Sequence, residues 1–164
     1  MADHFLLIVG ILMLLGVANS TPIFAKRLFG QRFGAPLDGG LKFPDGRPLF
    51  GPSKTVRGLV LSVACTMLAA PLLGFEWITG AGLASASMFG DLLSSFIKRR
   101  LGLRTHSRAF GLDQVPESLL PLLVLQQHLD LGYGDIAIIV AAFILLEMVL
   151  SHLLFRLHIR DRPY

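Results

Sequence analysis

Residues 58–97 read GLVLSVACTMLAAPLLGFEWITGAGLASASMFGDLLSSFI and contain no lysine or arginine. A helix needs roughly 20 apolar residues to cross a bilayer, so this stretch is long enough for two crossings. Cations flank it on both sides, at Arg57 and at 98–100. Because two crossings return the chain to its starting side, both cationic flanks are expected at the same membrane surface.

The rest of the chain repeats this pattern. All fifteen lysines and arginines fall within 26–57, 98–108 and 156–162, and apolar segments separate these stretches. Hydrophobic residues make up 53% of the chain and the mean hydropathy is +0.64, which argues against a water-soluble domain. The sequence predicts an all-α fold, a polytopic membrane helix bundle that forms a single domain over 1–164. About five transmembrane helices are expected, over 5–24, 56–73, 75–89, 116–129 and 136–155.

The third and fourth of these segments are shorter than a full span. They are expected to continue past the lipid or to border a wet cavity, where polar backbone and side chains are tolerated. Within the resulting bundle, lipid tails are expected to enter beside these two segments.

The charge distribution predicts the orientation of the chain. Lysine and arginine gather on the cytoplasmic side of membrane proteins. The opposite side receives acidic residues and no cation: Asp3, Glu76, Asp130 and Asp135. We therefore expect an integral protein of the cell (inner) membrane, with the N-terminus outside and the polar loops and C-terminus in the cytoplasm. A net charge of +4 suits binding of anionic headgroups and nucleotides at the inner face.

The first polar loop, 36–58, has nine glycines or prolines and six charged residues among its 23 positions. Glycine lets backbone N–H groups approach a ligand and proline fixes turns, as in loops that cradle anions. Asp38 and Asp45 are candidate ligands for a hard divalent cation, and Arg47, Lys54 and Arg57 are candidates for binding phosphates. The alternative is a solvated connector containing ordinary turns.

Asn19 and Pro22 precede this loop and have two interpretations. They can form a helix stop at the membrane boundary, since proline interrupts the helical hydrogen bonds. Alternatively, Asn19 makes a polar contact inside the bundle, because polar groups at that depth need partners.

The second polar segment carries its charges at helical spacing. Asp91, Ser95 and Lys98 stand at i, i+4 and i+7, so they share one face of a helix leaving the membrane, with Arg99 beside them. The alternative is a stop-transfer cluster at 98–100 whose charge Asp91 offsets. Asp113 begins the fourth apolar segment, where it either returns to meet Asp91 or caps the helix.

As a set, these motifs resemble the CDP-archaeol synthase family of integral membrane, CTP-dependent cytidylyltransferases. The resemblance runs in order along nearly the whole chain and rests on six elements: Ala18-Asn19-x-x-Pro22 with Lys26, Pro36-Leu37-Asp38-x-Gly40, Asp45-Gly46-Arg47, Phe50-Gly51-x-x-Lys54-Thr55-x-Arg57-Gly58, Gly90-Asp91-x-x-x-Ser95-Phe96-x-Lys98-Arg99-Arg100, and Asp113-Gln114. The second segment is also similar to that of the phosphatidate cytidylyltransferases.

The resemblance implies transfer of CMP from CTP to a lipid phosphate, archaetidic acid-like or phosphatidate-like, for phospholipid biosynthesis. The products are a CDP-activated lipid and pyrophosphate. The expected cofactor is Mg²⁺, and the expected partners are CTP, the lipid phosphate and the bilayer, without nucleic acid. The proposed catalytic residues are Asp91, Lys98, Lys54 and Asp113, the substrate-binding residues are Asn19, Arg47, Arg57, Ser95 and Arg99, and the metal ligands are Asp91 and Asp113, with Asp38 or Asp45.

Two other classes of function remain open from the residues. A non-enzymatic module that binds lipid or phosphate explains the cations but gives the neighbouring carboxylates no role. A small transporter predicts polar residues through several spans, whereas the first two apolar segments are almost uniformly apolar.

Overall fold

The computed structural model describes residues 2–103 and 111–156, with side chains described from 3 to 151 over the same ranges. Four of the cations used above, Arg104, Arg108, Arg160 and Arg162, and with them the C-terminus, lie outside the described residues.

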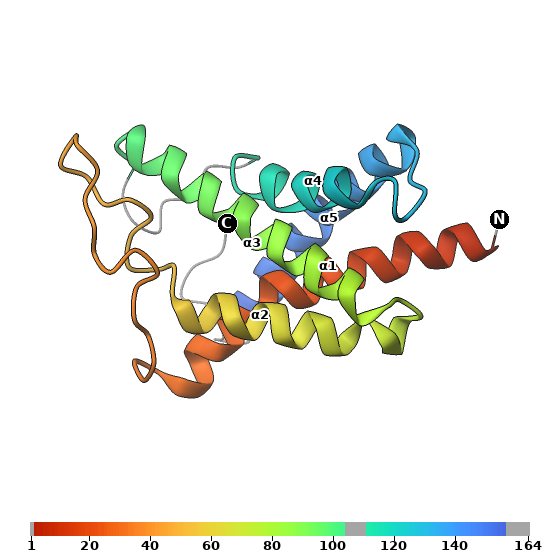
Figure 1. Ribbon diagram of the computed structural model, residues 1–164, viewed down its shortest axis with the longest axis horizontal. Coiled ribbons are helices and arrows are strands. Elements are labelled where there is room, and N and C mark those ends of the chain that lie inside the picture. The colour runs from red at the N-terminus through yellow and green to blue at the C-terminus, as the bar shows by residue number, and fades with distance from the viewer. Residues whose placement is uncertain (1, 104–110, 157–164) are drawn as a thin grey trace.

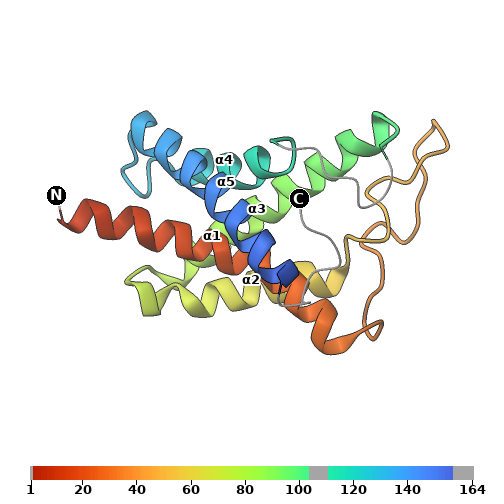
Figure 2. The ribbon, with the colours of Figure 1, turned by 180° about the vertical axis from the view of Figure 1, so that it is seen from behind.

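Over these described ranges, five helices form the bundle: α1 (Ala2–Phe29), α2 (Val56–Ala69), α3 (Trp77–Arg100), α4 (Gln114–Leu125) and α5 (Tyr133–Arg156), with a 3-10 turn, η1, at Pro71–Leu73. α1, α2 and α4 run roughly along the long axis of the molecule and α3 crosses it obliquely, with the loop between α1 and α2 at one end and the N-terminus at the other (Figure 1). α5 also crosses it obliquely, as the view from behind shows (Figure 2). The predicted all-α membrane bundle is confirmed.

Among the described residues, three stretches are long and apolar enough to cross a membrane: Asp3–Phe29, Val56–Leu73 and Tyr133–Ser151. These are the three segments that the sequence predicts as full spans. The fourth segment is the shorter apolar helix α4. The third segment corresponds to the helix α3, which extends beyond the apolar residues. It continues through the polar stretch to Arg100 and is roughly 36 Å long.

The outer and inner faces of the helices have the polarity expected of a membrane protein. On α2, Val60 and Leu68 are exposed, while Ser62 and Thr66 are fully buried. Gly80 of α3 lies so close to α2 that an added Cβ would be 2.6 Å from the Cβ of Ala70. Small residues let membrane helices approach this closely, whereas large apolar residues face the lipid.

Apolar packing joins α1, α3, α4 and α5 through one buried cluster, whose fully buried members include Ile11, Leu14, Leu83, Leu122 and Ile139. Near the N-terminal end of the bundle, His4 Nε2 lies 2.9 Å from Asp135 Oδ1. Thr79 Oγ1 lies 2.9 Å from His128 Nε2. These contacts join α1 to α5, and α3 to the turn that follows α4.

Pro22 does not end α1, which continues to Phe29. Asn19, one turn earlier, donates a hydrogen bond from Nδ2 to Ser87 Oγ of α3 at 3.1 Å. The same nitrogen donates to the carbonyl of Leu15 at 3.0 Å. Of the two interpretations, the structure therefore favours the polar contact inside the bundle over the helix stop.

Candidate active site

The loop between α1 and α2 is folded. Residues 41–49 form a short hairpin in which Phe43 N donates to Arg47 O at 2.8 Å and Leu49 N donates to Leu41 O at 3.0 Å. Gly46 occupies its turn with a φ of 77°, a backbone conformation that glycine adopts without strain. Leu37 N donates to Lys54 O at 2.8 Å and so brings the two ends of the loop together. Residues 41–48 are exposed, as the alternative of a solvated connector expects, but the hydrogen bonds give the segment a defined fold.

Asp38 holds the loop from inside. Its Oδ1 accepts a hydrogen bond from Gly40 N at 3.0 Å, and its Oδ2 accepts from Phe50 N at 2.9 Å and from Gly51 N at 3.0 Å. Burial alone would raise the pKa of this carboxyl, but the backbone hydrogen bonds outweigh it and lower the pKa below its ordinary value of 3.8. Asp38 therefore stays ionised at neutral pH and closes the loop.

Replacing Asp38 tests this role. Asp38→Asn keeps the shape but turns one acceptor oxygen into a donor, so at least one loop N–H loses its partner at a local cost of about 1–3 kcal/mol. We expect faster protease cleavage within 41–49 in the variant. In the unmodified protein, a folded pKa below the unfolded one means that this stabilisation is present above about pH 4 and is lost as the pH falls through the folded value. Cleavage should therefore be independent of pH between about 5 and 8; a rise across that range would contradict the assignment.

The hairpin is attached to the C-terminal end of α3 by two arginines. Arg47 Nη1 donates to the carbonyls of Arg99 at 3.3 Å and of Arg100 at 2.6 Å, in the last turn of the helix. Arg100 Nη1 lies 2.7 Å from Asp45 Oδ1. The Arg100 guanidinium also lies 4.5 Å from the ring centre of Phe43 and 5.0 Å from that of Phe96. The first loop is thus fixed to the second polar segment.

Arg57 has a similar anchoring contact at the other side of the loop. Its Nη1 donates to the carbonyls of Gly30, at 3.2 Å, and of Arg32. Its guanidinium lies over the ring of Phe29, 5.8 Å from the centre. Arg57 therefore joins the end of α1 to the start of α2. The sequence assigned Arg47 and Arg57 to phosphates, and these backbone contacts are a structural role that the sequence did not predict.

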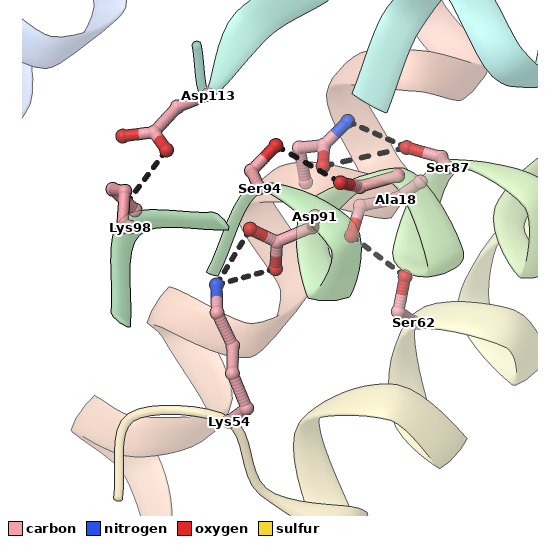
Figure 3. Close-up of polar contacts among 10 residues, drawn as sticks. Ala18, Lys54, Ser62, Ser87, Asp91, Ser94, Lys98 and Asp113 are labelled. Atoms are coloured by element: carbon pink, nitrogen blue, oxygen red, sulfur yellow. Dashed lines mark hydrogen bonds and ion pairs between the residues drawn. The ribbon is translucent and has the colours of Figure 1, made fainter. Parts of the chain in front are cut away.

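Two lysine–aspartate ion pairs lie along α3 (Figure 3). Lys54 Nζ, from the loop, is 2.6 Å from Asp91 Oδ1 and 2.5 Å from Asp91 Oδ2. Lys98 Nζ, from the end of α3, is 2.6 Å from Asp113 Oδ1. The Lys54 and Asp91 side chains are each 22% exposed, so both remain accessible. The two polar segments, separated in sequence by a helical hairpin, meet at one surface.

Asp113 occupies the N-cap position of α4 but makes no side-chain capping hydrogen bond. Its carboxylate instead pairs with Lys98. Asp113 thus stands at the cap position, as one interpretation expected, and its carboxylate returns to α3, but its partner there is Lys98, two turns beyond Asp91. Ser95 and Arg99, between and beside these groups on α3, are 3% and 6% exposed.

Glu117 is an acidic residue of this region that the sequence interpretation missed. It is only 6% exposed, in the first turn of α4. Its carboxylate lies within electrostatic range of Asp91, Lys54 and Asp113, and of Glu147 on α5. Its position could have been predicted from the sequence, because Glu117 stands four residues after Asp113 and the two therefore share a helix face. Glu117 therefore places a further carboxyl group in the region of Asp91 and Asp113.

The sequence model of the protein family described as CarS-like CDP-archaeol synthase matches residues 72–164, which are more than half of the chain and include α3 and α4. The chain belongs to the CDP-archaeol synthase family. A CDP-archaeol synthase of Sulfurisphaera tokodaii is 36% identical over 156 residues, covering 90% of this chain and 89% of that protein. One of Pyrobaculum calidifontis is 35% identical, covering 90% and 91%. The family resemblance read from the motifs is confirmed.

A solved structure supports the same family at the level of the fold. The structure, described as an intramembrane enzyme for archaeal membrane lipids biosynthesis, superposes with a TM-score of 0.74 at 28% identity, covering 86% of this chain and 90% of that one. The expectation of an integral, multi-pass membrane protein is confirmed.

The family chemistry raises the question of a metal site. Within 2–103 and 111–151, no three His, Cys, Asp or Glu side chains are grouped closely enough to hold a metal ion. The expected addition of Asp38 or Asp45 to Asp91 and Asp113 is therefore not met. Asp38 receives backbone N–H groups on both oxygens, and Asp45 Oδ1 accepts from Arg100 and from Arg47 N. Mg²⁺ commonly uses only one or two carboxylates together with substrate phosphates, so a group of three carboxylates is not required for it to bind.

Proposed function

We propose that this protein transfers CMP from CTP to a lipid phosphate of the archaetidic acid type, giving a CDP-activated lipid and pyrophosphate. The family relationship supports cytidylyl transfer, since the relatives are CDP-archaeol synthases. The observation that carries the proposal for these residues is the contact of Lys54 with Asp91, at 2.5 and 2.6 Å. It places a cation from one polar segment beside a carboxylate from the other, at the surface where a phosphate and a metal ion must meet.

Transfer between phosphates requires positioning and charge neutralisation more than a covalent nucleophile on the protein. An oxygen of the lipid phosphate attacks the α-phosphorus of CTP. The bond between that phosphorus and the oxygen that bridges it to the β-phosphorus breaks, and pyrophosphate leaves. Lys54, Lys98 and Arg99 bind and orient the phosphates. Asp91 and Asp113 are the proposed ligands of Mg²⁺, which when bound would neutralise phosphate charge. Ser95 and Asn19 orient polar groups near these residues.

The proposed orientation follows from the ends of the bundle. The described cations from Lys26 to Arg100 lie in the last turn of α1, the loop between α1 and α2, the first turn of α2 and the C-terminal end of α3. The loop and the end of α3 are at the end of the molecule opposite the N-terminus (Figure 1). We assign this end to the cytoplasm, where CTP is available and where cations gather.

Pyrophosphate release tests the proposed function directly. Detergent-solubilised protein is given Mg²⁺, one of the four nucleoside triphosphates and one lipid phosphate from a panel that includes an isoprenoid ether and a diacyl phosphate. We expect pyrophosphate only when both substrates are present, with CTP preferred and with the ether-linked phosphate preferred over the diacyl one. Chelation with EDTA should abolish it, because the phosphates lose their neutralising cation.

The same assay separates the alternatives. If no pairing releases pyrophosphate while lipid phosphate still binds, a binding module explains the protein better. Movement of lipid phosphate or nucleotide across sealed vesicles without turnover would instead favour a transporter. A preference for diacyl over ether-linked phosphate would leave the reaction in place and change the assigned acceptor.

A further inference from the structure

The two ion pairs lie at different depths along α3. Asp91 follows the apolar part of the helix and Lys98 stands seven residues later, roughly 10 Å further along the axis. Figure 3 shows the Lys54–Asp91 and Lys98–Asp113 pairs on separate turns. The Lys54–Asp91 pair, here called the deep pair, is the nearer to the apolar part of α3. The Lys98–Asp113 pair, the shallow pair, is nearer to the polar end.

A cavity adjoins the deep pair. It lies between α1, α2, α3 and the end of the loop, has a volume of about 60 Å³ and opens to the surface. Its charged lining residues, among those described, are Lys54 and Asp91, and much of its wall is apolar, including Leu59, Met88 and Leu92. An apolar cavity with a lysine on its wall is complementary to an amphiphile with an anionic head.

We propose that this cavity binds the acceptor lipid phosphate, while the triphosphate of the nucleotide binds at the shallow pair. The acceptor phosphate contacts Lys54, and the first carbons of its apolar part lie along Leu59, Met88 and Leu92. This assignment rests on the proposed function and divides its two substrates between two sites. The nucleotide has no hydrocarbon chain to fill the apolar wall, and it arrives from water at the polar end.

The neighbouring helix interface offers no comparable space. At Gly90, one residue before Asp91, a Cβ atom would lie 2.2 Å from the carbonyl oxygen of Pro116 in α4. The backbones of α3 and α4 are thus in contact at the depth of the deep pair. A lipid chain therefore reaches Asp91 more readily from the α2 side of α3 than between α3 and α4. Entry at this position lies beside the third segment, in line with the expectation from the sequence.

Acceptor binding then changes the partner of Lys54. Asp91 holds Lys54 through both carboxylate oxygens, so an incoming phosphate competes with Asp91 for the same ammonium group. As the phosphate takes Lys54, the carboxylate of Asp91 becomes available to a cation. In the transfer step, a deprotonated acceptor oxygen forms the bond to the α-phosphorus, and the electron pair of the broken bond leaves on pyrophosphate.

A matched pair of α2 variants tests the location. Leu59→Trp fills the cavity, whereas Val60→Trp adds the same side chain at the next residue, which is 54% exposed. For Leu59→Trp we expect the KM for lipid phosphate to rise at least about 10-fold. The KM for CTP should stay within about 2-fold, and Val60→Trp should leave both within that range. Equal increases for both substrates in Leu59→Trp would overturn the assignment.

A pair of lysine variants tests the division of substrates by equilibrium binding in detergent, without turnover. Lys54→Met should weaken binding of the lipid phosphate by about 10-fold or more and that of CTP much less, and Lys98→Met should do the reverse. Weaker CTP binding in Lys54→Met with unchanged lipid phosphate binding would overturn the inference. Pyrophosphate release by the unmodified protein would then still support the proposed function, so the two can fail separately.

Cross-linking supplies a measurement that needs no variant. A lipid phosphate with a diazirine on its first chain carbons is photolysed with the unmodified protein, and the adducts are mapped by mass spectrometry. Adducts at Leu59 or within 88–92 are expected, and excess unlabelled lipid phosphate should suppress them. Adducts confined to α4, or to the groove that Ile23 of α1 and Leu146 of α5 line, would overturn the proposal.

Discussion

Asp91→Asn is expected to reduce the rate of pyrophosphate release by at least about 10³-fold, since it removes the charge proposed to hold a cation at the reacting phosphates. The amide keeps the shape of the carboxylate but neither ligates Mg²⁺ comparably nor forms an ion pair with Lys54. The loss should appear mainly in kcat, because Lys54 and the cavity remain for binding the lipid phosphate. Steady-state kinetics in which the concentrations of both substrates are varied measure how much of the loss lies in kcat and how much in KM.

The matched control is Asp130→Asn. Asp130 precedes α5 and is exposed, and asparagine tolerates its φ of 50°. We expect unchanged turnover in the control and thermal unfolding temperatures close to that of the unmodified protein for both variants. If Asp91→Asn retained turnover within about 10-fold of the unmodified enzyme while Asp130→Asn behaved as expected, Asp91 would not be a ligand of the catalytic cation.

The sequence predicted the helices well because apolar length and charge placement are strong signals in a membrane protein. The segment predicted over 56–73 corresponds to α2 and η1, which together give the span Val56–Leu73. The predicted stripe of Asp91, Ser95 and Lys98 also lies on one continuous helix, α3. Its spacing could be read because helical periodicity places such residues on one face.

Contacts between residues that are distant in the sequence could not be predicted from helical periodicity. Arg47 meets the carbonyls at the end of α3, and a backbone carbonyl has the same chemistry in every residue, so no side-chain pattern marks it as a partner. Asp38 resembled a metal ligand because its residue type suits a cation, but the fold of the loop directs backbone N–H groups to both of its oxygens. Residue type predicted which groups carry charge; the fold decided what neutralises them.

The second large effect concerns Gly90, which sets the distance between α3 and α4. Gly90→Ala would place a methyl group 2.2 Å from Pro116 O, 2.5 Å from Pro116 C and 2.8 Å from Glu117 N. These are backbone atoms, so no side-chain rotation can relieve the overlap and the helices must move apart. Overpacking of this kind costs about 1–3 kcal/mol or more. We expect a clearly lower thermal unfolding temperature in detergent and a loss of most turnover.

Gly82→Ala is the matched control on the same helix, since its Cβ would meet only the Cδ2 of Leu125, at an ordinary 3.6 Å. This variant should unfold near the temperature of the unmodified protein and keep its turnover. Gly90 adjoins Asp91, and the atoms it touches adjoin Glu117, so separating the helices also shifts the acidic groups around Lys54. For this reason, stabilising the bundle with added lipid should recover the unfolding temperature of Gly90→Ala more than its kcat. Full recovery of both would mean that Gly90 serves packing alone and that the geometry around Asp91 tolerates displacement.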